Sequence, residues 1–399
     1  MATVKNAYVF VADALRWDHL PDRLHEIGDV KKTVASSTLS PTSFASITSG
    51  LYPPHHGVKT FSHQVRSDRN WMLEAETHNT SFWQSSSDDP IYDVLNQNPS
   101  EKKRVDDIEA PFINIERELL THAPYGVSED ETGANSNASS FINKESIEIT
   151  GLRKKYSHGV ERAVSTFEER LASLNDRDIL DETLIIFTSD HGELLGEYGT
   201  FSHTSPLVPE LVYVPTVFIH PNGVNPEMDG ILSHIDISTT IADVLDIEIP
   251  YRTSGMSAYS DTTRKGAYAG FEFPPNYGAF GESTSFKYRY HNRVDSIWDV
   301  DGGWSFRDPQ YIAKIQKFLK HMTPTSVRLR NTLRQNPYAI LKLSKILLRN
   351  DNKFGSPKFS KEFAQDKIDE ICAKSKTGSI HNDFDQIQKD RLRDLGYLD

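Results

Sequence analysis

The segment LIIFTSDHGELLGEYGTFSH, residues 184–203, decides the fold class of this chain. It begins with an apolar β-branched and aromatic run, typical of a buried parallel strand, which stops at Asp190-His191-Gly192. The carboxyl end of such a strand is where an open α/β sheet binds its ligands. Carboxylate and imidazole are both metal ligands, and His203 follows His191 by twelve positions. The segment therefore predicts a strand that ends in a reactive site.

Strand-like and helix-like patterns alternate along the rest of the chain. Three more buried strands are expected at 6–15, 110–116 and 212–221, the last two being read as further parallel strands. Helices are expected at 40–50, 157–176 and 237–250, with Ser157 as the cap of the second. This alternation predicts an α/β fold around a mainly parallel sheet.

The sequence pattern changes after about residue 260. A Gly-rich and aromatic stretch, 266–283, leads into a basic helical region at 309–350, while the polar stretch 128–140 is typical of a surface loop. We therefore predict a catalytic domain over 1–260 and a C-terminal subdomain over 261–399, with a final segment returning to the core.

Composition excludes several classes of protein. A formal net charge of −12 argues against nucleic-acid binding, and the mean hydropathy of −0.52 is that of a soluble globular chain. Cys372 is the only cysteine, which excludes an internal disulfide framework. The N-terminal apolar run is too short for a signal peptide and meets Asp13 early. These features lead us to expect a cytoplasmic protein.

Four segments carry residues that fit one chemical step: Asp13, Ser40, His122, and the run from Asp190-His191 to His203. A divalent cation held by two carboxylates and an imidazole would acidify a serine hydroxyl and make it nucleophilic. Ser40 precedes Pro41 at an expected helix start, where backbone N–H groups favour anions. Two histidines could then bind an oxyanion or protonate a leaving oxygen.

These segments resemble the sulfatase branch of the alkaline phosphatase superfamily over about the first 260 residues. The matching pieces occur in the family's order and are YVFVADALRWDHL (8–20), SPTSFASITSGLYPPHHGV (40–58), HAPYG (122–126), TSDHGELLGEYGTFSH (188–203) and SHIDISTTIADVLDIEIP (233–250). The terminal LRDLGYLD (392–399) matches more weakly. The resemblance implies a three-layer α/β/α sandwich.

By the same resemblance, Asp13, Asp190 and His191 would bind one divalent metal ion (Mn²⁺, Mg²⁺, Ca²⁺ or Zn²⁺), with Ser40 as nucleophile and fourth ligand. His122 and His203 would contact the transferred group. Thr42 and Ser43 remain rivals to Ser40 because the register could slip. His56 matches a family histidine, for which we favour a structural role, and Arg16 and Asp18 are expected to shape the first loop.

Three departures from the sulfatase pattern limit the kinds of ester that this site is expected to cleave. The run Ser40-Pro41-Thr42-Ser43-Phe44 lacks the third-position proline and the fifth-position arginine of the formylglycine motif. The sulfatase Asp-Asp pair is here Asp13-Ala14, and no Asp-x-x-x-His segment for a second metal is evident. We therefore favour hydrolysis of phosphate mono- or diesters over sulfate esters, through a covalent Ser40 intermediate.

Two other functions are kept as alternatives. The same intermediate could be captured by a glycan or lipid hydroxyl, which would make the protein a transferase, or the fold could serve a non-catalytic binding protein. The region 309–350 contains nine Lys or Arg and no acid. It is read either as solvated helices packed on the core or as a basic surface for peripheral membrane contact.

Overall fold

The computed structural model describes residues 3–85, 88–127, 148–199, 201, 203, 207–273, 292–307, 334, 336–374 and 380–381. The expected loop at 128–140, most of the basic region and the terminal 392–399 lie outside these residues. Within them, a seven-stranded sheet has the order β4-β5-β1-β6-β7-β2-β9. Its strands are β1 (Asn6–Ala12), β2 (Asp29–Val34), β4 (Asn79–Trp83), β5 (Phe112–Glu118), β6 (Thr183–Thr188), β7 (Tyr213–Ile219) and β9 (Leu232–Ser233).

The sheet is mostly parallel, and one strand departs from the prediction. The β4, β5, β1 and β6 strands run parallel, as does the β2–β9 pair. β7 was expected to be parallel but is antiparallel to both β6 and β2. The short α8 (Pro209–Val212) leads directly into β7, and the described residues of the connection from β6 contain no longer helix that could act as a crossover. A run of apolar residues shows burial but does not reveal strand direction.

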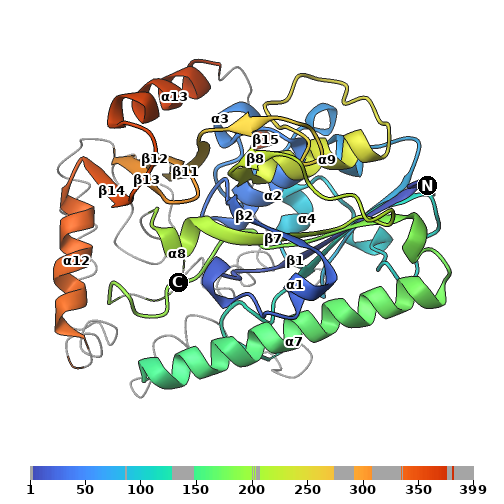
Figure 1. Cartoon of the computed structure of the whole chain (residues 1–399), viewed down its shortest axis with the longest axis horizontal. Helices are drawn as coiled ribbons and strands as arrows, with labels where there is room; N and C mark the ends of the chain where they lie inside the picture. Colours follow the sequence, from blue (N-terminus) through green and yellow to red (C-terminus); the bar gives the residue numbers. More distant parts are fainter. Residues whose placement is uncertain are drawn as a thin grey trace.

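Helices cover both faces of this sheet (Figure 1), which confirms the three-layer α/β/α architecture. Alternate residues of β1 enter the two cores: Val9 packs in the cluster that includes Phe44 and Ile241, and Phe10 in the cluster that includes Phe167. The first face carries α2 (Ser40–Ser49), α4 (Ile91–Val94) and α9 (His234–Val244), and the opposite face carries α7 (Ile149–Asp176). The remaining short helices near the sheet are α1 (Leu24–Ile27) and α3 (Pro53–His56).

Two helices show where local sequence signals were sufficient and where they were not. α2 spans Ser40–Ser49 as expected, and Gly50 ends it in the left-handed conformation with φ 69°. α7 begins at Ile149, eight residues before the predicted cap. Ser157 therefore lies inside the helix, because Leu152 and Tyr156 extend its buried stripe toward the N-terminus.

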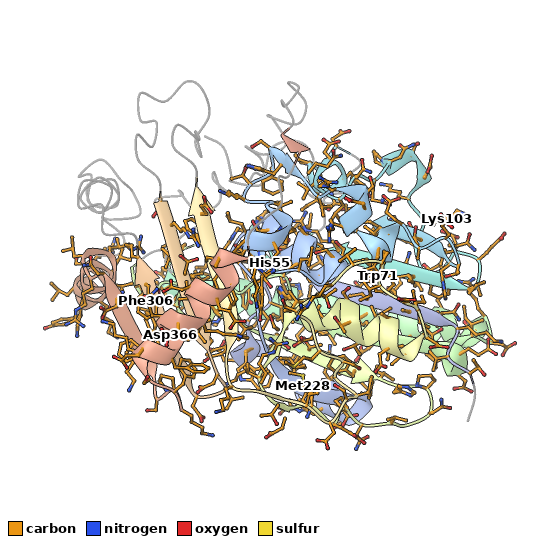
Figure 2. The ribbon with its side chains drawn as sticks, turned by 90° about the horizontal axis from the view of Figure 1, so that it is seen from above. His55, Trp71, Lys103, Met228, Phe306 and Asp366 are labelled. Carbon is orange, nitrogen blue, oxygen red and sulfur yellow. The ribbon has the colours of Figure 1, made fainter. Side chains whose placement is uncertain are left out.

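A second, antiparallel sheet follows the α/β unit along the chain, in the order β11-β12-β13-β14. Its strands are β11 (Ala267–Phe273), β12 (Asn292–Trp298), β13 (Gly302–Arg307) and β14 (Asp351–Gly355), accompanied by α12 (Pro337–Leu348) and α13 (Lys361–Ala373). Figure 2 places Phe306 of β13 and Asp366 of α13 at one end of the molecule and Lys103 at the other. The His55 ring of α3 contacts the carbonyl oxygen of Ile371 at 2.9 Å, which joins α13 to the α/β unit.

Two short strand pairs lie outside the two larger sheets. β8 (Asp229–Gly230) pairs with β10 (Thr263–Arg264), and β3 (His63–Gln64) pairs with β15 (Ile380–His381). Within the ranges that the structure describes, no helix combines the length and the apolar character needed to cross a bilayer.

Two glycines of α7 give a matched test of how closely this helix approaches the loop after β5. A Cβ on Gly159 would lie 2.3 Å from the Leu120 carbonyl oxygen, whereas one on Gly151 would have no neighbour within 4 Å. Gly151→Ala should stabilise the protein by about 0.5–1 kcal/mol through helix propensity. Gly159→Ala should destabilise it by about 1–3 kcal/mol because of the overlap. Urea unfolding measures both, and equal stabilisation by the two substitutions would refute the close approach.

Candidate active site

The carboxyl ends of β1 and β6 bring two aspartates together. These strands are parallel neighbours, with Val11 opposite Thr188. Asp13 directly follows β1, and Asp190 lies two residues beyond the end of β6. Both carboxylates therefore emerge at the same edge of the sheet, where the sequence predicted the site.

Asp13, Asp190 and His191 form a buried cluster whose potential ligand atoms all lie within 4.8 Å of one another. Oδ1 of Asp13 and Oδ2 of Asp190 are buried and have no hydrogen-bond partner. The Nδ1 atom of His191 lies 3.0 Å from the carbonyl oxygen of Gly192, to which it donates, and this leaves the Nε2 lone pair available as a ligand. Since unpaired buried carboxylate oxygens are costly, these three side chains fit a divalent cation.

The pKa values of the two carboxyl groups shift in opposite directions, because Asp13 is paired with Arg117 and Asp190 lies beside the charge of Asp13. Burial raises the pKa of both, but at Asp13 the Arg117 guanidinium and neighbouring histidines outweigh burial and lower the pKa. At Asp190, burial and the nearby Asp13 charge together raise the pKa. A bound cation would relieve this crowding.

Ser40 is the candidate hydroxyl that reaches the cluster. It is the first residue of α2, and its Oγ lies 3.2 Å from Nε2 of His191. The rival Ser43 donates to the Ser37 carbonyl oxygen at 3.0 Å, and Thr42 lines a cavity beside the second sheet. The geometry therefore brings the Ser40 hydroxyl to the cluster, at a helix N-terminus suited to an anion, while the contacts of Thr42 and Ser43 lie elsewhere.

His122 and His203 lie beside the cluster, as the sequence predicted. The ring of His203 stacks on His191 at 4.0 Å between centroids, and the His122 ring lies 5.5 Å from that of His203. The Nδ1 atom of each donates to a carbonyl oxygen at 3.0 Å, of Ala123 for His122 and of Thr38 for His203. Burial lowers the pKa of both rings, which favours their neutral form. Because Nδ1 of each ring donates to a carbonyl oxygen, the neutral ring carries its proton on Nδ1.

Arg117 is a site residue that the sequence analysis missed. This fully buried side chain of β5 pairs with Asp13 at 2.6 Å and with Asp89 at 3.2 Å. Its Nη2 also lies 3.4 Å from Oγ of Ser40, and its guanidinium carbon lies 5.5 Å from the centre of the Phe44 ring. A cation thus reaches Ser40 from β5, although the arginine position of the formylglycine motif is occupied by phenylalanine.

One sequence signal could have revealed Arg117. It directly follows the buried strand predicted at 110–116 and lies inside the observed β5, and a charged residue in a buried strand requires a partner. Which partner it meets depends on strand order, because Asp13 and Asp89 are distant in sequence.

The loop after β1 is fixed by strained backbone and ion pairs. Ala14 has a positive φ of 62°, and its N–H donates to Oδ1 of Asp190 at 3.1 Å. Arg16 forms a bidentate pair with Asp18 and reaches Glu197 at 2.6 Å, which links this loop to the one after β6. Arg16 and Asp18 thus shape the loop, as expected.

Two other histidines support the local structure. His56 lies 3.0 Å from the Ser46 hydroxyl and accepts a hydrogen bond from the Val58 N–H. His234 accepts from the Ser36 N–H through Nδ1, so its Nε2 donates to the Ser189 carbonyl oxygen. Burial lowers the pKa of each ring to about 3, which keeps both neutral.

The mainly parallel sheet, with two carboxylates and an imidazole at its carboxyl edge beside a helix-terminal serine, has an alkaline-phosphatase-like fold. Solved structures support this fold. The phosphonate monoester hydrolase of Agrobacterium radiobacter matches with a TM-score of 0.57 and 14% identity, covering 95% of this chain and all of that one. A 2-O GAG sulfatase matches with a TM-score of 0.55 and 11% identity, covering 89% and 96%.

The chain belongs to the sulfatase family. The Sulfatase family profile matches residues 119–247. A low-salt glycan biosynthesis sulfotransferase of Haloferax volcanii, Agl7, is 31% identical over 314 residues, which cover 75% of this chain and 74% of the relative. Mouse arylsulfatase K is also 31% identical, but only over 28% of this chain and 20% of its own length.

The Asp190→Asn substitution tests the metal site, because it should raise the melting temperature of the metal-free protein and remove the stabilisation by metal ions. Without metal the variant should melt at a higher temperature than the parent, because the amide removes a crowded charge and can still accept from the Ala14 N–H. It should lose the stabilisation that Mn²⁺, Mg²⁺, Ca²⁺ or Zn²⁺ gives the parent after EDTA treatment. Thermal unfolding with and without each ion measures both effects. Equal stabilisation of parent and variant by every ion would exclude this site.

Proposed function

We propose that this protein cleaves esters of a tetrahedral oxyanion through a covalent Ser40 intermediate, with phosphate mono- or diesters preferred over sulfate esters. The observation that supports the proposal most strongly is the position of the Ser40 Oγ. It lies 3.2 Å from the imidazole of His191, within a cluster that contains unpartnered carboxylate oxygens of Asp13 and Asp190. The preference for phosphate rests on the lack of a formylglycine motif.

The first step is attack by Ser40. Asp13, Asp190 and His191 would hold one divalent ion, which would lower the pKa of the serine hydroxyl and offset negative charge on the ester. Ser40 loses its proton to solvent, and Arg117 Nη2, at 3.4 Å, stabilises the charge on Oγ. As Oγ bonds to the phosphorus or sulfur atom, the bond from that atom to the leaving oxygen breaks.

The buried histidines would handle the proton in this reaction. A bound anionic ester favours protonation of His122 and His203, whose pKa values are otherwise lowered by burial. One imidazolium then donates its proton to the leaving oxygen. In the second step water returns a proton to the same ring while its oxygen displaces Oγ of Ser40. The departing Oγ takes up a proton from solvent, which restores the starting state.

A glycan or lipid hydroxyl in place of water would make the protein a transferase. This alternative is favoured by the similarity to a glycan biosynthesis sulfotransferase over three quarters of the chain. It keeps the Ser40 intermediate and changes only the second nucleophile. A non-catalytic role has less support, because the proposed ligands and the nucleophile lie together.

The nucleophile and the substrate preference can be tested together. The 4-nitrophenyl phosphate, bis-phosphate, phosphonate and sulfate esters should be assayed with Mn²⁺, Mg²⁺, Ca²⁺ and Zn²⁺, with phosphate esters expected to be cleaved fastest. Ser40→Ala should lower kcat by about 10³-fold or more, while Ser43→Ala should remain within about tenfold of the parent. Activity restricted to the sulfate ester and retained in Ser40→Ala would overturn both assignments. A sugar-ester product formed on adding a glucoside would favour the transferase.

A second proposal concerns peripheral membrane contact through α12. In the described part of the basic region, Tyr338 and Leu341 are 73% and 66% exposed, beside the exposed Lys342 and Lys345. Exposed apolar and cationic side chains on one helix suit an anionic lipid surface. Replacing Lys342, Lys345 and Arg349 by Glu should abolish co-sedimentation with phosphatidylserine liposomes. Unchanged binding, or no binding by the parent, would contradict this proposal.

A further inference from the structure

A cavity of about 350 Å³ lies between the α3 region and the second sheet. Its wall includes Thr42 of α2, Lys59, and the ends of β11 and β12 where Glu272 and Arg293 lie. Cavities of this size hold small organic ligands. None of the predicted metal ligands lines it, so the cavity is separate from the cluster around Asp13.

The charged groups of the cavity wall are balanced. Lys59 forms an ion pair with Glu272, and Arg293 forms a bidentate pair with Asp295, with contacts of 2.8 and 3.0 Å. Among the described residues of the wall, two cations thus face two carboxylates, so this part of the wall has no excess charge of either sign. Such pairs offer hydrogen-bond donors and acceptors side by side, which suits vicinal hydroxyl groups more than an ionised ligand.

Apolar surface completes the cavity wall. Tyr268 and Phe271 line it together with Pro53 and Pro54 of α3. The Tyr268 hydroxyl donates to Asp295 at 2.6 Å, which holds this ring in place. Polar pairs combined with aromatic and proline surface match the two kinds of surface on a sugar ring, its hydroxyl edges and its C–H faces.

The cavity is tied structurally to the proposed nucleophile. Thr42 lies two residues after Ser40 in α2, and its buried Oγ1 has no hydrogen-bond partner. The Gly270 N–H of β11 donates to the Ser36 carbonyl oxygen at 2.8 Å, just before α2 begins. The wall of the second sheet is therefore anchored to the segment that positions Ser40.

We propose that this cavity binds a neutral sugar residue of the substrate or acceptor. This proposal rests on the proposed function, because it takes the sugar to be part of the ester substrate or of the acceptor. It adds to that function the chemical class of the substrate. It predicts that hexoses without a charged group bind here better than uronic acids or sugar sulfates. Recognition by the second sheet is then separate from bond cleavage at Ser40.

Cys372 provides a probe that does not depend on catalysis. It lines the cavity and is the only cysteine in the chain, so alkylation by iodoacetamide reports on one position. Burial raises the pKa of this thiol, so the reaction is run near pH 9. In the Ser40→Ala variant, at least one of methyl glucoside, methyl mannoside and N-acetylglucosamine should slow alkylation at least threefold at 100 mM. Glycerol controls for solvent effects.

Variants that change the charge of the cavity wall should change which sugars protect Cys372. Glu272→Gln leaves Lys59 without its carboxylate, so glucuronate should now protect Cys372 better than the neutral sugars do. Lys59→Gln should weaken protection by glucuronate further. Lys367→Gln, which removes an exposed pair with Glu370 on the same α13 helix, should behave like the parent. Protection ratios are compared within each variant.

Two outcomes would overturn the proposal. The first is that no neutral sugar protects Cys372 from alkylation. The second is that, without a charge substitution in the cavity, glucuronate or glucose 6-sulfate protects Cys372 as well as the neutral sugars do. Because the alkylation assay uses Ser40→Ala, it separates this site from the proposed reaction. If neutral sugars protect Cys372 but the protein cleaves no 4-nitrophenyl ester, the sugar site stands and the proposed reaction is rejected. If the protein cleaves an ester but no neutral sugar protects Cys372, the proposed reaction stands and the sugar site is rejected.

Discussion

The arrangement of the site depends on one electrostatic constraint: two aspartate carboxylates are buried side by side. Asp13 and Asp190 are fully inaccessible to solvent, and each keeps one oxygen without a hydrogen-bond partner. Like charges held this closely in a low-dielectric site repel strongly and require positive charge nearby. Arg117 supplies part of that charge from β5, and the geometry fits a divalent cation for the rest. The same positive charge would make Ser40 nucleophilic.

The fold maintains this unfavourable arrangement through backbone geometry. The parallel register of β1 and β6 brings the aspartates together, and the strained Ala14 gives its N–H to Asp190. A positive φ at alanine costs about 1–2 kcal/mol, which the surrounding hydrogen bonds and packing must offset. His234 adds a buried connection between Ser36, before α2, and Ser189, beside Asp190. The segment that leads into α2 and the segment that follows β6 are thereby joined by one neutral ring.

The proposed chemistry and the proposed recognition are divided between the two sheets. The carboxyl edge of the first sheet collects the charged groups around Ser40, while the cavity beside the second sheet pairs its described cations, Lys59 and Arg293, with carboxylates. With a divalent cation beside Asp13 and Asp190 the first site would attract an oxyanion, whereas charge-balanced ion pairs suit hydroxyl groups. A transferase and a hydrolase could share this arrangement, since they differ in the nucleophile of the second step.

The sequence by itself determined the parts governed by local patterns: the apolar runs of β1, β5 and β6, the α2 helix with its Gly50 end, and the six candidate site residues that the structure gathers. It failed where the answer required contacts between distant segments. The direction of β7 was misjudged because a buried strand reads alike in both directions, and the start of α7 because packing of Leu152 and Tyr156 extended the helix. Only the tertiary structure decided that Arg117 meets Asp13 and Ser40, and that β11 and β12 complete a charge-balanced cavity near α2. Strand order and sheet packing set those distances, and neither is encoded within a single segment.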